Sequence, residues 1–176
     1  LEPIYVKLLR ALKPGGFLAI WQTQLYFKHF WSWFGDDIHI YAGCKNFVQL
    51  RKTAINFAYD PIILKYKAGE MILRPQKPNR NVDFFVANTA KFVTQTQNIE
   101  RLHPCPRPID QTEELVKQFT VPNGLVLDCF MGSGTTAVAC LRYGRRFVGC
   151  DESNEYCEIS QKRIEKELLV KPDFYD

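Results

Sequence analysis

The feature that most constrains how this chain folds is a glycine-rich turn at residues 127–140 (LDCFMGSGTTAVAC). The apolar run before the turn is typical of a buried strand, and a second strand and a charged amphipathic helix follow it. We expect these strands and helices, in chain order, over residues 124–128, 134–143, 146–150 and 153–168. This βαβα order predicts an α/β fold with a doubly wound, mostly parallel sheet. The charges over 158–168 are interpreted as the solvated face of the last helix.

The rest of the chain contains further elements of the same kind. The run FLAIW at 17–21 is typical of a strand that is buried on both faces. Asp60-Pro61 inside another strand indicates a bend, a bulge or a sheet edge. The further helices are expected over 2–12, 25–34 and 108–119, and the further strands over 17–21, 38–43 and 57–66. Residues 67–100 are the least regular and predict a solvent-facing loop.

Composition fits one globular domain. The chain has 176 residues, enough for a hydrophobic core, with 46% apolar and 24% charged residues. No apolar run is long enough to span a bilayer, and no secretory signal is visible. The six cysteines contain no CxxC pair and the three histidines are scattered, so the sequence predicts no metal site and a reducing cytoplasm. The net charge of +4 is compatible with a nucleic-acid partner.

The glycine-rich turn has the features of a nucleotide-type ligand site. The first strand brings Asp128 to its carboxyl end, where ligands bind in sheets of this class. Gly132 and Gly134 allow the backbone to turn sharply and to approach a ligand. Asp151 ends the next strand, and its carboxylate can accept both hydroxyls of a ribose. The hydroxyl side chains that can cap the following helix are those of Ser133, Thr135 and Thr136.

Two cofactor classes compete for this turn. Residues 132–137 (GSGTTA) fit the dinucleotide pattern GxGxxA, which makes NAD one alternative. Asp128 favours S-adenosylmethionine, because its carboxylate would repel a pyrophosphate and attract the ammonium of a methionine-like ligand. A turn that binds nothing is disfavoured, because Asp128, the glycines and Asp151 all agree with a ligand site.

These residues resemble the amino-methyltransferases of DNA, the adenine-specific and cytosine-N4-specific enzymes of restriction-modification systems. The first motif of that family reads D-P-F-x-G-S-G-T-T, and residues 128–136 read D-C-F-M-G-S-G-T-T, with Cys129 in place of the proline. Residues 144–164 (GRRFVGCDESNEYCEISQKRI) are similar to the family segment G-R-x-x-I-G-x-E-x-x-x-x-Y-x-x-x-A-x-x-R. In this resemblance Asp151 takes the place of the ribose-binding glutamate.

Three segments further upstream extend the resemblance over nearly the whole chain. Residues 101–108 (RLHPCPRP) are similar to H-P-x-x-K-P, which in the family closes over the methionine end of the cofactor, and Arg107 replaces its lysine. Residues 8–21 (LLRALKPGGFLAIW) match R-x-L-K-P-G-G, and residues 60–63 (DPII) match E-P-I-L. The cofactor motif comes last, as in the permuted subclass of the family whose catalytic motif comes first.

The resemblance implies a Rossmann-like, S-adenosylmethionine-dependent methyltransferase fold. It implies one domain over 1–176, with a catalytic-side half at 1–66, a variable loop at 67–100 and a cofactor-binding half at 101–176. The residues implied to bind the cofactor are Asp128, Phe130, Gly132, Ser133, Gly134, Thr135, Asp151, His103, Cys105 and Arg107. The loop basic residues expected to contact DNA are Arg74, Lys77 and Arg80. A solvated loop without such contacts is the alternative.

The implied reaction is methyl transfer to the exocyclic amino group of adenine, favoured over cytosine, in double-stranded DNA. The resemblance places such an enzyme in a restriction-modification, phage or mobile-element system. Two alternatives remain: a remnant that binds the cofactor without transferring a methyl group, and a methyltransferase of the same fold that acts on RNA or protein.

The catalytic motif of the family, (Asp/Asn/Ser)-Pro-Pro-aromatic, is absent from the sequence, so we assign no catalytic residue. The nearest match, residues 60–63, lacks the second proline and the aromatic residue. By family order the motif precedes Leu1, and we expect the chain to be a C-terminal portion of a longer protein. The strands at 124–128 and 17–21 would then lack the strand between them. We therefore expect the chain alone to be unstable, swapped or dimeric.

Overall fold

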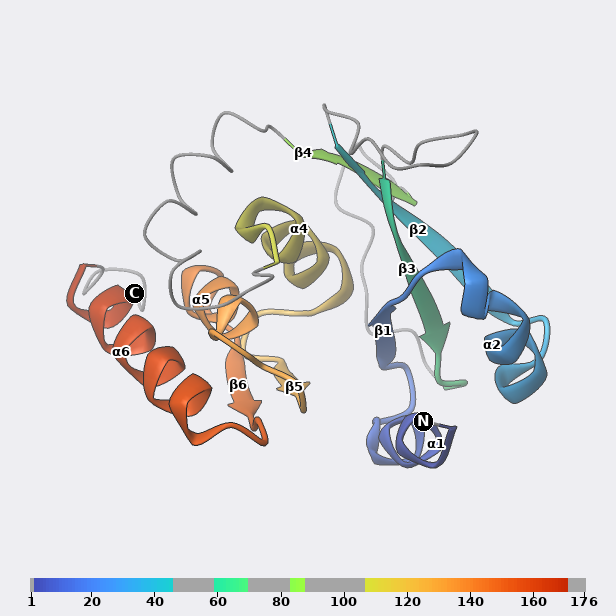
Figure 1. Ribbon diagram of the computed structural model, residues 1–176, viewed down its shortest axis with the longest axis horizontal. Coiled ribbons are helices and arrows are strands. Elements are labelled where there is room, and N and C mark those ends of the chain that lie inside the picture. Colours follow the sequence, from blue (N-terminus) through green and yellow to red (C-terminus); the bar gives the residue numbers. More distant parts are fainter. Residues whose placement is uncertain (1, 46–58, 70–82, 88–106, 171–176) are drawn as a thin grey trace. The chain divides into compact units, whose positions relative to one another are not determined.

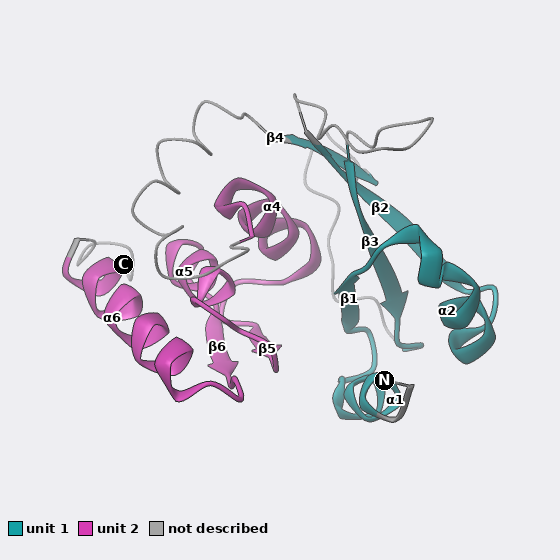
Figure 2. Cartoon of the chain, viewed as in Figure 1, with its two compact units in different colours: residues 1–87 teal, residues 88–176 magenta. Residues whose placement is uncertain are grey.

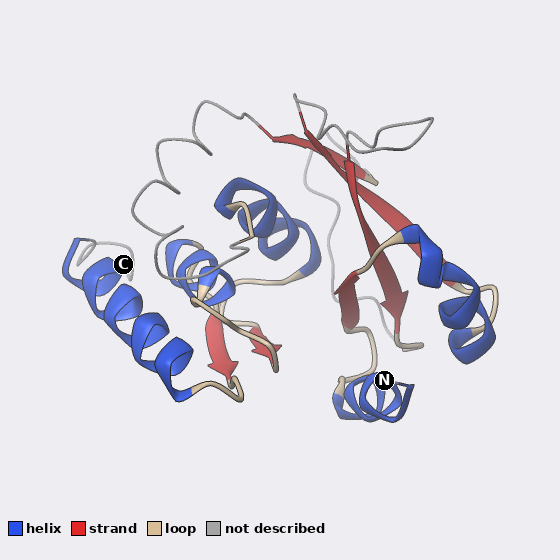
Figure 3. Cartoon of the chain, viewed as in Figure 1, coloured by secondary structure: helices blue, strands red, loops and turns tan. Residues whose placement is uncertain are grey.

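The computed structural model describes residues 2–45, 59–69, 83–87 and 107–170. The chain forms two compact units, residues 1–87 and 88–176 (Figure 2). Each unit has its own sheet with helices beside it (Figures 1 and 3). The expectation of a single domain over 1–176 concerns how the two units pack together, and it stays a prediction.

Every helix and strand expected from the sequence is found, with small shifts at the ends. The helices are α1 (Glu2–Ala11), α2 (Phe27–Phe34), α4 (Ile109–Phe119), α5 (Thr135–Arg142) and α6 (Asn154–Val170), with a short 3-10 helix η1 (Gln24–Tyr26). The strands are β1 (Phe17–Trp21), β2 (Ile38–Lys45), β3 (Tyr59–Tyr66), β4 (Phe84–Ala87), β5 (Leu125–Asp128) and β6 (Arg146–Gly149). Strand β4 was not expected, because it lies within the predicted loop at 67–100.

The sheet of the first unit has the strand order β1-β3-β2-β4. Strand β3 is antiparallel to both β1 and β2, whereas β2 and β4 are parallel. The second unit contains the parallel pair β5–β6, which the βαβα pattern predicts. The fold is therefore α/β as expected, and among the described strands two pairings are parallel and two are antiparallel.

Pro61 lies in β3, which is an inner strand of its sheet rather than an edge. Its carbonyl accepts a hydrogen bond from the backbone N–H of Gln22, 3.2 Å away, so the backbone nitrogen and carbonyl of Pro61 face the β1 side. The last residue pair between β1 and β3 is Trp21 with Ile62, so the ladder has already ended beside Pro61. The proline thus occupies a local edge, where a missing N–H breaks no ladder bond.

The core of the first unit is built around β3. Ile63 pairs with Ile20 of β1 and with Ile40 of β2, which sets three isoleucines in one row across the sheet. Phe30 of α2 packs against this row and is almost completely buried. Ile62, on the opposite face of β3, is also fully buried. Burial on both faces therefore occurs at β3, whereas in β1, where the sequence predicted it, Ala19 is exposed.

A charged side chain lies in this apolar setting. Lys65 of β3 is buried, and its Nζ donates hydrogen bonds to the carbonyl oxygens of Phe34 (3.2 Å) and Asp37 (3.0 Å). It also donates to the Asp37 carboxylate at 2.8 Å. The ammonium beside it holds the pKa of the Asp37 carboxyl below its ordinary value. Lys65 thereby fixes the turn between α2 and β2 against the sheet.

The second unit has helices against one face of β5 and β6. Val116 of α4 with Ala139 and Cys140 of α5 forms a buried cluster, against which Val126 and Phe147 of the two strands pack. The alternate strand residues are about half exposed, namely Leu125, Leu127 and Val148. The sequence predicted a buried strand here, and that prediction is wrong for the described residues. Among those residues, the unit's own helices cover one face of this two-stranded sheet.

Charged residues connect helices α4, α5 and α6 of the second unit. The Arg142 guanidinium of α5 donates to the Glu113 carboxylate of α4 at 2.7 Å and to the Glu167 carboxylate of α6 at 2.7 Å. These hydrogen bonds raise the pKa of Arg142 above its ordinary value, although its partial burial opposes them. Glu167 belongs to the stretch interpreted as a solvated face. That interpretation is wrong at Glu167, because its side chain is only 16% exposed and its carboxylate binds Arg142.

Candidate functional site

The carboxylate of Asp128 anchors the start and the end of the glycine-rich loop, residues 128–136. Its Oδ1 accepts a hydrogen bond from the backbone N–H of Phe130 at 3.0 Å, and its Oδ2 accepts one from the Thr136 hydroxyl at 2.6 Å. Thr136 was expected to cap α5, but the N-cap residue is Gly134 and no side chain caps this helix. The hydroxyl of Thr136 instead fixes the orientation of the Asp128 carboxylate.

Asp151, two residues after the end of β6, holds the middle of the loop. Its Oδ2 accepts a hydrogen bond from the backbone N–H of Gly132 at 2.9 Å, and its Oδ1 accepts one from the backbone N–H of Ser153 at 3.1 Å. The backbone N–H of Met131 donates to the carbonyl of Cys150 at 3.2 Å. The two βα turns, although 19 residues apart in sequence at Gly132 and Asp151, are therefore joined side by side at the carboxyl ends of the strands.

The glycine at position 134 is required by both backbone conformation and packing. Its φ of 78° lies in the left-handed region, which favours glycine. A Cβ at this position would lie 2.3 Å from the Oγ of Ser160 in α6, which is a severe overlap. The loop therefore rests directly on α6. Gly132 also has a positive φ, of 48°.

Arg163 of α6 supports the loop from the same helix. Its guanidinium donates to the carbonyl and, at 3.0 Å, to the hydroxyl of Ser133, and it reaches the Thr135 hydroxyl at 3.5 Å. Ser133 and Thr135 are buried, so in this structure their hydroxyls serve the contact with Arg163. Burial lowers the pKa of the Arg163 guanidinium from its ordinary value. The expected contact of Ser133 and Thr135 with a cofactor stays a prediction.

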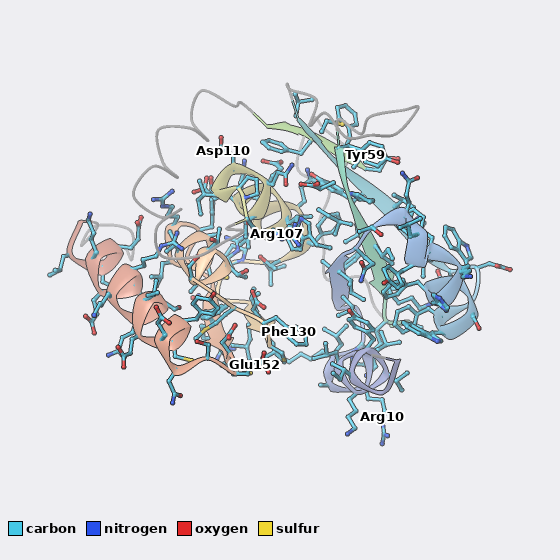
Figure 4. The ribbon with its side chains drawn as sticks, viewed as in Figure 1. Arg10, Tyr59, Arg107, Asp110, Phe130 and Glu152 are labelled. Carbon is cyan, nitrogen blue, oxygen red and sulfur yellow. The ribbon has the colours of Figure 1, made fainter. Side chains whose placement is uncertain are left out.

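The two carboxylates of the site are free to attract a cation. Within the part of the chain that the structure describes, neither Asp128 nor Asp151 forms an ion pair. Each carboxylate accepts two hydrogen bonds and can accept more, because a carboxylate offers about four lone-pair positions. Phe130, next to Asp128, is 63% exposed, and Figure 4 shows it with Glu152 at these turns. The site is thus suited to a ligand with a positive charge, hydroxyl donors and an apolar surface.

Some residues that the sequence assigned to sites lie outside the described residues. They are His103, Cys105, Arg74, Lys77 and Arg80. Arg107 is described, and it is exposed immediately before α4 (Figure 4). Among the residues of the described ranges, no group of three or more His, Cys, Asp or Glu is placed to hold a metal ion. No described helix is both long and apolar enough to cross a membrane.

Sequence reasoning missed Arg163 and the contact between Asp151 and Gly132. Arg163 stands among several charged residues of α6, and its match to the closing arginine of the family segment that residues 144–164 resemble is the signal that could have identified it. Asp151 was expected to bind a ligand, but its hydrogen bond to the loop depends on the spatial approach of two turns. The sequence contains no local signal for that approach.

The sequence profile of a DNA methylase family matches residues 19–162, which is most of the chain. The chain therefore belongs to this family of DNA methylases. The family resemblance stated from the motifs is confirmed.

Curated relatives support the same assignment over part of their length. The chain is 33% identical over 117 residues to the Type II methyltransferase M1.MboII of Moraxella bovis, covering 57% of this chain and 45% of that protein. It is 42% identical over 64 residues to the putative methylase YubD of Escherichia coli K12, covering 36% of this chain and 28% of that protein. The chain thus matches less than half the length of these relatives.

Solved structures show that the fold is that of DNA methyltransferases. The crystal structure of M1.HpyAVI superposes with a TM-score of 0.70 and 20% identity, over 93% of this chain and 82% of that chain. A putative DNA modification methylase from Thermus thermophilus, complexed with S-adenosyl-L-methionine, gives a TM-score of 0.66 and 18% identity, over 94% and 75%. The Rossmann-like fold expected from the sequence is therefore confirmed.

Proposed function

We propose that the loop 128–136 and Asp151 bind S-adenosylmethionine, and that the chain is part of a DNA methyltransferase. Such an enzyme would transfer a methyl group to the exocyclic amino group of adenine or cytosine in double-stranded DNA. Membership of the DNA methylase family supports this, as do relatives named Type II methyltransferases. The fold is shared with solved structures of M1.HpyAVI and of a putative DNA modification methylase, each in complex with S-adenosyl-L-methionine.

The observation that carries the proposal is the hydrogen-bonded arrangement of Asp128, Gly132 and Asp151. It places two carboxylates without ion-pair partners in the described structure at the carboxyl ends of neighbouring parallel strands. A pyrophosphate at the glycine-rich loop would be repelled by the Asp128 carboxylate, so the arrangement disfavours a dinucleotide. The ammonium and ribose hydroxyls of S-adenosylmethionine match the acceptors that the site offers.

The roles of the residues follow from this chemistry. Asp128 would accept the ammonium of the methionine moiety, and Asp151 would accept the ribose hydroxyls. Phe130 would provide an apolar wall, while Gly132 and Gly134 let the backbone approach the ligand. When bound, S-adenosylmethionine supplies an electrophilic methyl group on a sulfonium. We assign no residue of this chain to binding of the target amine.

The proposal also includes further residues, most of which lie outside the described ranges. His103, Cys105 and the described Arg107 would close over the methionine end of the cofactor. Arg74, Lys77 and Arg80 would contact DNA phosphates. The relatives come from bacteria, and we place the protein in a cytoplasm of that kind, where DNA is accessible.

Titration calorimetry tests cofactor binding. The chain is titrated with S-adenosylmethionine and, separately, with NAD, and only the first is expected to bind. Asp151→Asn keeps the size of the side chain but removes its charge, so we expect about 10- to 100-fold weaker binding of S-adenosylmethionine. The matched control is Glu155→Gln on exposed α6, which should change the affinity by less than about twofold. Preferential binding of NAD would refute the cofactor assignment.

A transfer assay tests the reaction class. The chain is incubated with S-adenosylmethionine labelled in its methyl group and with DNA, RNA or protein, alone and after extension by the upstream coding sequence. Label in DNA amino groups supports the proposal. Label in RNA or protein only would favour the second function class, and binding without any transfer by the extended protein would favour a cofactor-binding remnant.

A further inference from the structure

Two cysteines follow directly after the two strands that form the site. Cys129 comes after β5 and Cys150 after β6, one position beyond the paired residues Asp128 and Gly149. The backbone N–H of Cys150 donates to the carbonyl of Asp128 at 3.1 Å. The Cys150 thiol lies 3.8 Å from the backbone carbonyl oxygen of Cys129 and donates a hydrogen bond to it. Both cysteines are free thiols in this structure.

The two thiols differ in their exposure to solvent. Cys150 is exposed, so a dissolved oxidant can reach its sulfur. Cys129 is half-buried, and this burial, together with the adjacent Cys150 and Asp128, raises its pKa. Cys140, in contrast, is buried in the core, where burial raises its pKa to about 12. The thiol of Cys157 lies 3.7 Å from the carbonyl of Asp151, on the α6 side of the turn.

We propose that Cys129 and Cys150 are a modification site for hydrogen peroxide, at which a disulfide closes across the ends of β5 and β6 and weakens ligand binding at the glycine-rich loop. The Cys150 sulfur attacks the peroxide oxygen, the O–O bond breaks, and a sulfenic acid and one water form. The Cys129 sulfur then attacks the Cys150 sulfur, and the S–O bond breaks to release a second water. One peroxide is reduced by two electrons, and two thiols lose two protons and two electrons.

Closure of this disulfide would act directly on the site. The two sulfurs must come within about 2 Å of each other, and this constrains the backbone after β5 against that after β6. The residues displaced are those next to Cys129, where the Phe130 N–H bonds to Asp128 and the Met131 N–H bonds to Cys150. The Gly132 bond to Asp151 follows one residue later. The consequence for S-adenosylmethionine rests on the proposed function, whereas formation of the disulfide does not.

Mass spectrometry tests the modification itself. The whole chain is treated with dilute hydrogen peroxide, its remaining thiols are alkylated, and the peptides are mapped. We expect a cross-linked Cys129–Cys150 peptide that is about 2 Da lighter than the sum of its reduced parts. Cys129→Ser and Cys150→Ser should each abolish it, and Cys157→Ser should leave it intact. Phenylarsine oxide, which bridges two nearby thiols, should be retained by the wild type and by Cys157→Ser only.

The coupling to the loop is tested by two independent readouts. We expect the Gly132 amide to exchange its hydrogen about tenfold faster in the oxidised chain, because it loses a bond to a charged acceptor. We expect S-adenosylmethionine to bind about tenfold more weakly to the oxidised chain, with recovery after dithiothreitol. Absence of the Cys129–Cys150 cross-link overturns the proposal. A disulfide that changes neither exchange nor affinity overturns its effect on the site. If the reduced chain binds no S-adenosylmethionine, the proposed function is wrong. The mass spectrometry and hydrogen-exchange results then still test whether the disulfide forms and whether it changes the loop.

Discussion

The sheets of the two units are stabilised in different ways. In the first unit, β3 lies between two antiparallel neighbours, and both Ile62 and Ile63 are fully buried. In the second unit, β5 and β6 pair only with each other among the described strands, and Leu127 is 49% exposed. The first sheet is thus held by apolar burial on both faces of its inner strand β3. The second is held by burial on one face and by hydrogen bonds at the ends of its strands.

This difference places the functional loop in the region where polar contacts matter most. The loop 128–136 is fixed by hydrogen bonds to Asp128, Asp151 and Arg163 rather than by a surrounding apolar core. Directional bonds set the positions of backbone N–H and carboxylate groups more closely than apolar packing does. A loop that must present two carboxylates in fixed positions benefits from that kind of support.

The largest expected difference in stability is between the truncation of an isoleucine in the first sheet and that of a leucine of the same size in the second. Ile63→Ala should lower the free energy of unfolding of the first unit by about 2–5 kcal/mol, because it removes buried methyl groups and leaves a cavity. Leu127→Ala should cost the second unit less than about 1 kcal/mol, because that side chain is already half exposed. Urea unfolding measures both. Tryptophan fluorescence reports the first unit, which contains Trp21, Trp31 and Trp33, and alkylation of buried Cys140 reports the second.

Equal costs for the two substitutions would break this comparison. They would mean that the exposed face of β5 and β6 is covered in solution. The expectation that the chain alone is unstable, swapped or dimeric stays a prediction, and it bears on this outcome. Sedimentation of the wild type and Leu127→Ala over a range of concentrations distinguishes a covered face from an exposed one.

An intermediate effect is expected at Arg163. Arg163→Met removes the donors to Ser133 and leaves its buried carbonyl without them, so the second unit should lose about 1.5–3 kcal/mol. Arg163→Lys should recover only part of this, because an ammonium cannot reproduce the planar fork of donors. Lys162→Met, on the exposed side of the same helix, is the matched control. If Arg163→Met lowers the free energy of unfolding no more than Lys162→Met does, the inference that Arg163 stabilises the loop is wrong.

The smallest effect concerns the polar exception in the first unit, the pair of Lys65 and Asp37. Because the folded pKa of Asp37 lies below its ordinary value, the pair stabilises the fold above about pH 4. That contribution is lost as the pH falls through the lowered folded pKa. Asp37→Asn should therefore reduce the acid sensitivity of the first unit, whereas Asp36→Asn should not. Fluorescence-detected urea midpoints between about pH 2 and 6 measure this, and parallel curves for all three chains would contradict it.

The two units also differ in how far the sequence could predict them. The strands and helices of the second unit follow from local patterns, because apolar runs, a glycine-rich turn and an amphipathic helix each leave a sequence signal. Strand β4 left no such signal, since Phe84–Ala87 is short and its parallel pairing with β2 joins segments far apart in sequence. Exposure of Leu125 and Leu127 was also missed, because an apolar run reports hydrophobicity and not the number of covering layers.

In the candidate site, the types of residue could be predicted but not their mutual contacts. Asp128, the glycines and Asp151 stand out because each follows a strand or breaks a helix pattern. The bonds of Asp151 to Gly132 and of Arg163 to Ser133 join residues 19 and 30 positions apart. Such contacts depend on how two turns and a helix approach one another, and a pattern along the chain does not encode the geometry of that approach.

The contact of Gly134 with Ser160 limits how the family can vary at a position far from the motif. Because a Cβ at 134 would overlap the Ser160 side chain, the loop already touches α6 at that point. A larger residue at 160 would have to push the loop away from α6, so only serine, alanine or glycine should be tolerated there. The size of the residue at position 160 is therefore limited by the loop, although this position lies outside the glycine-rich motif. Substitutions in α6 that are meant to improve solubility should leave Ser160 unchanged.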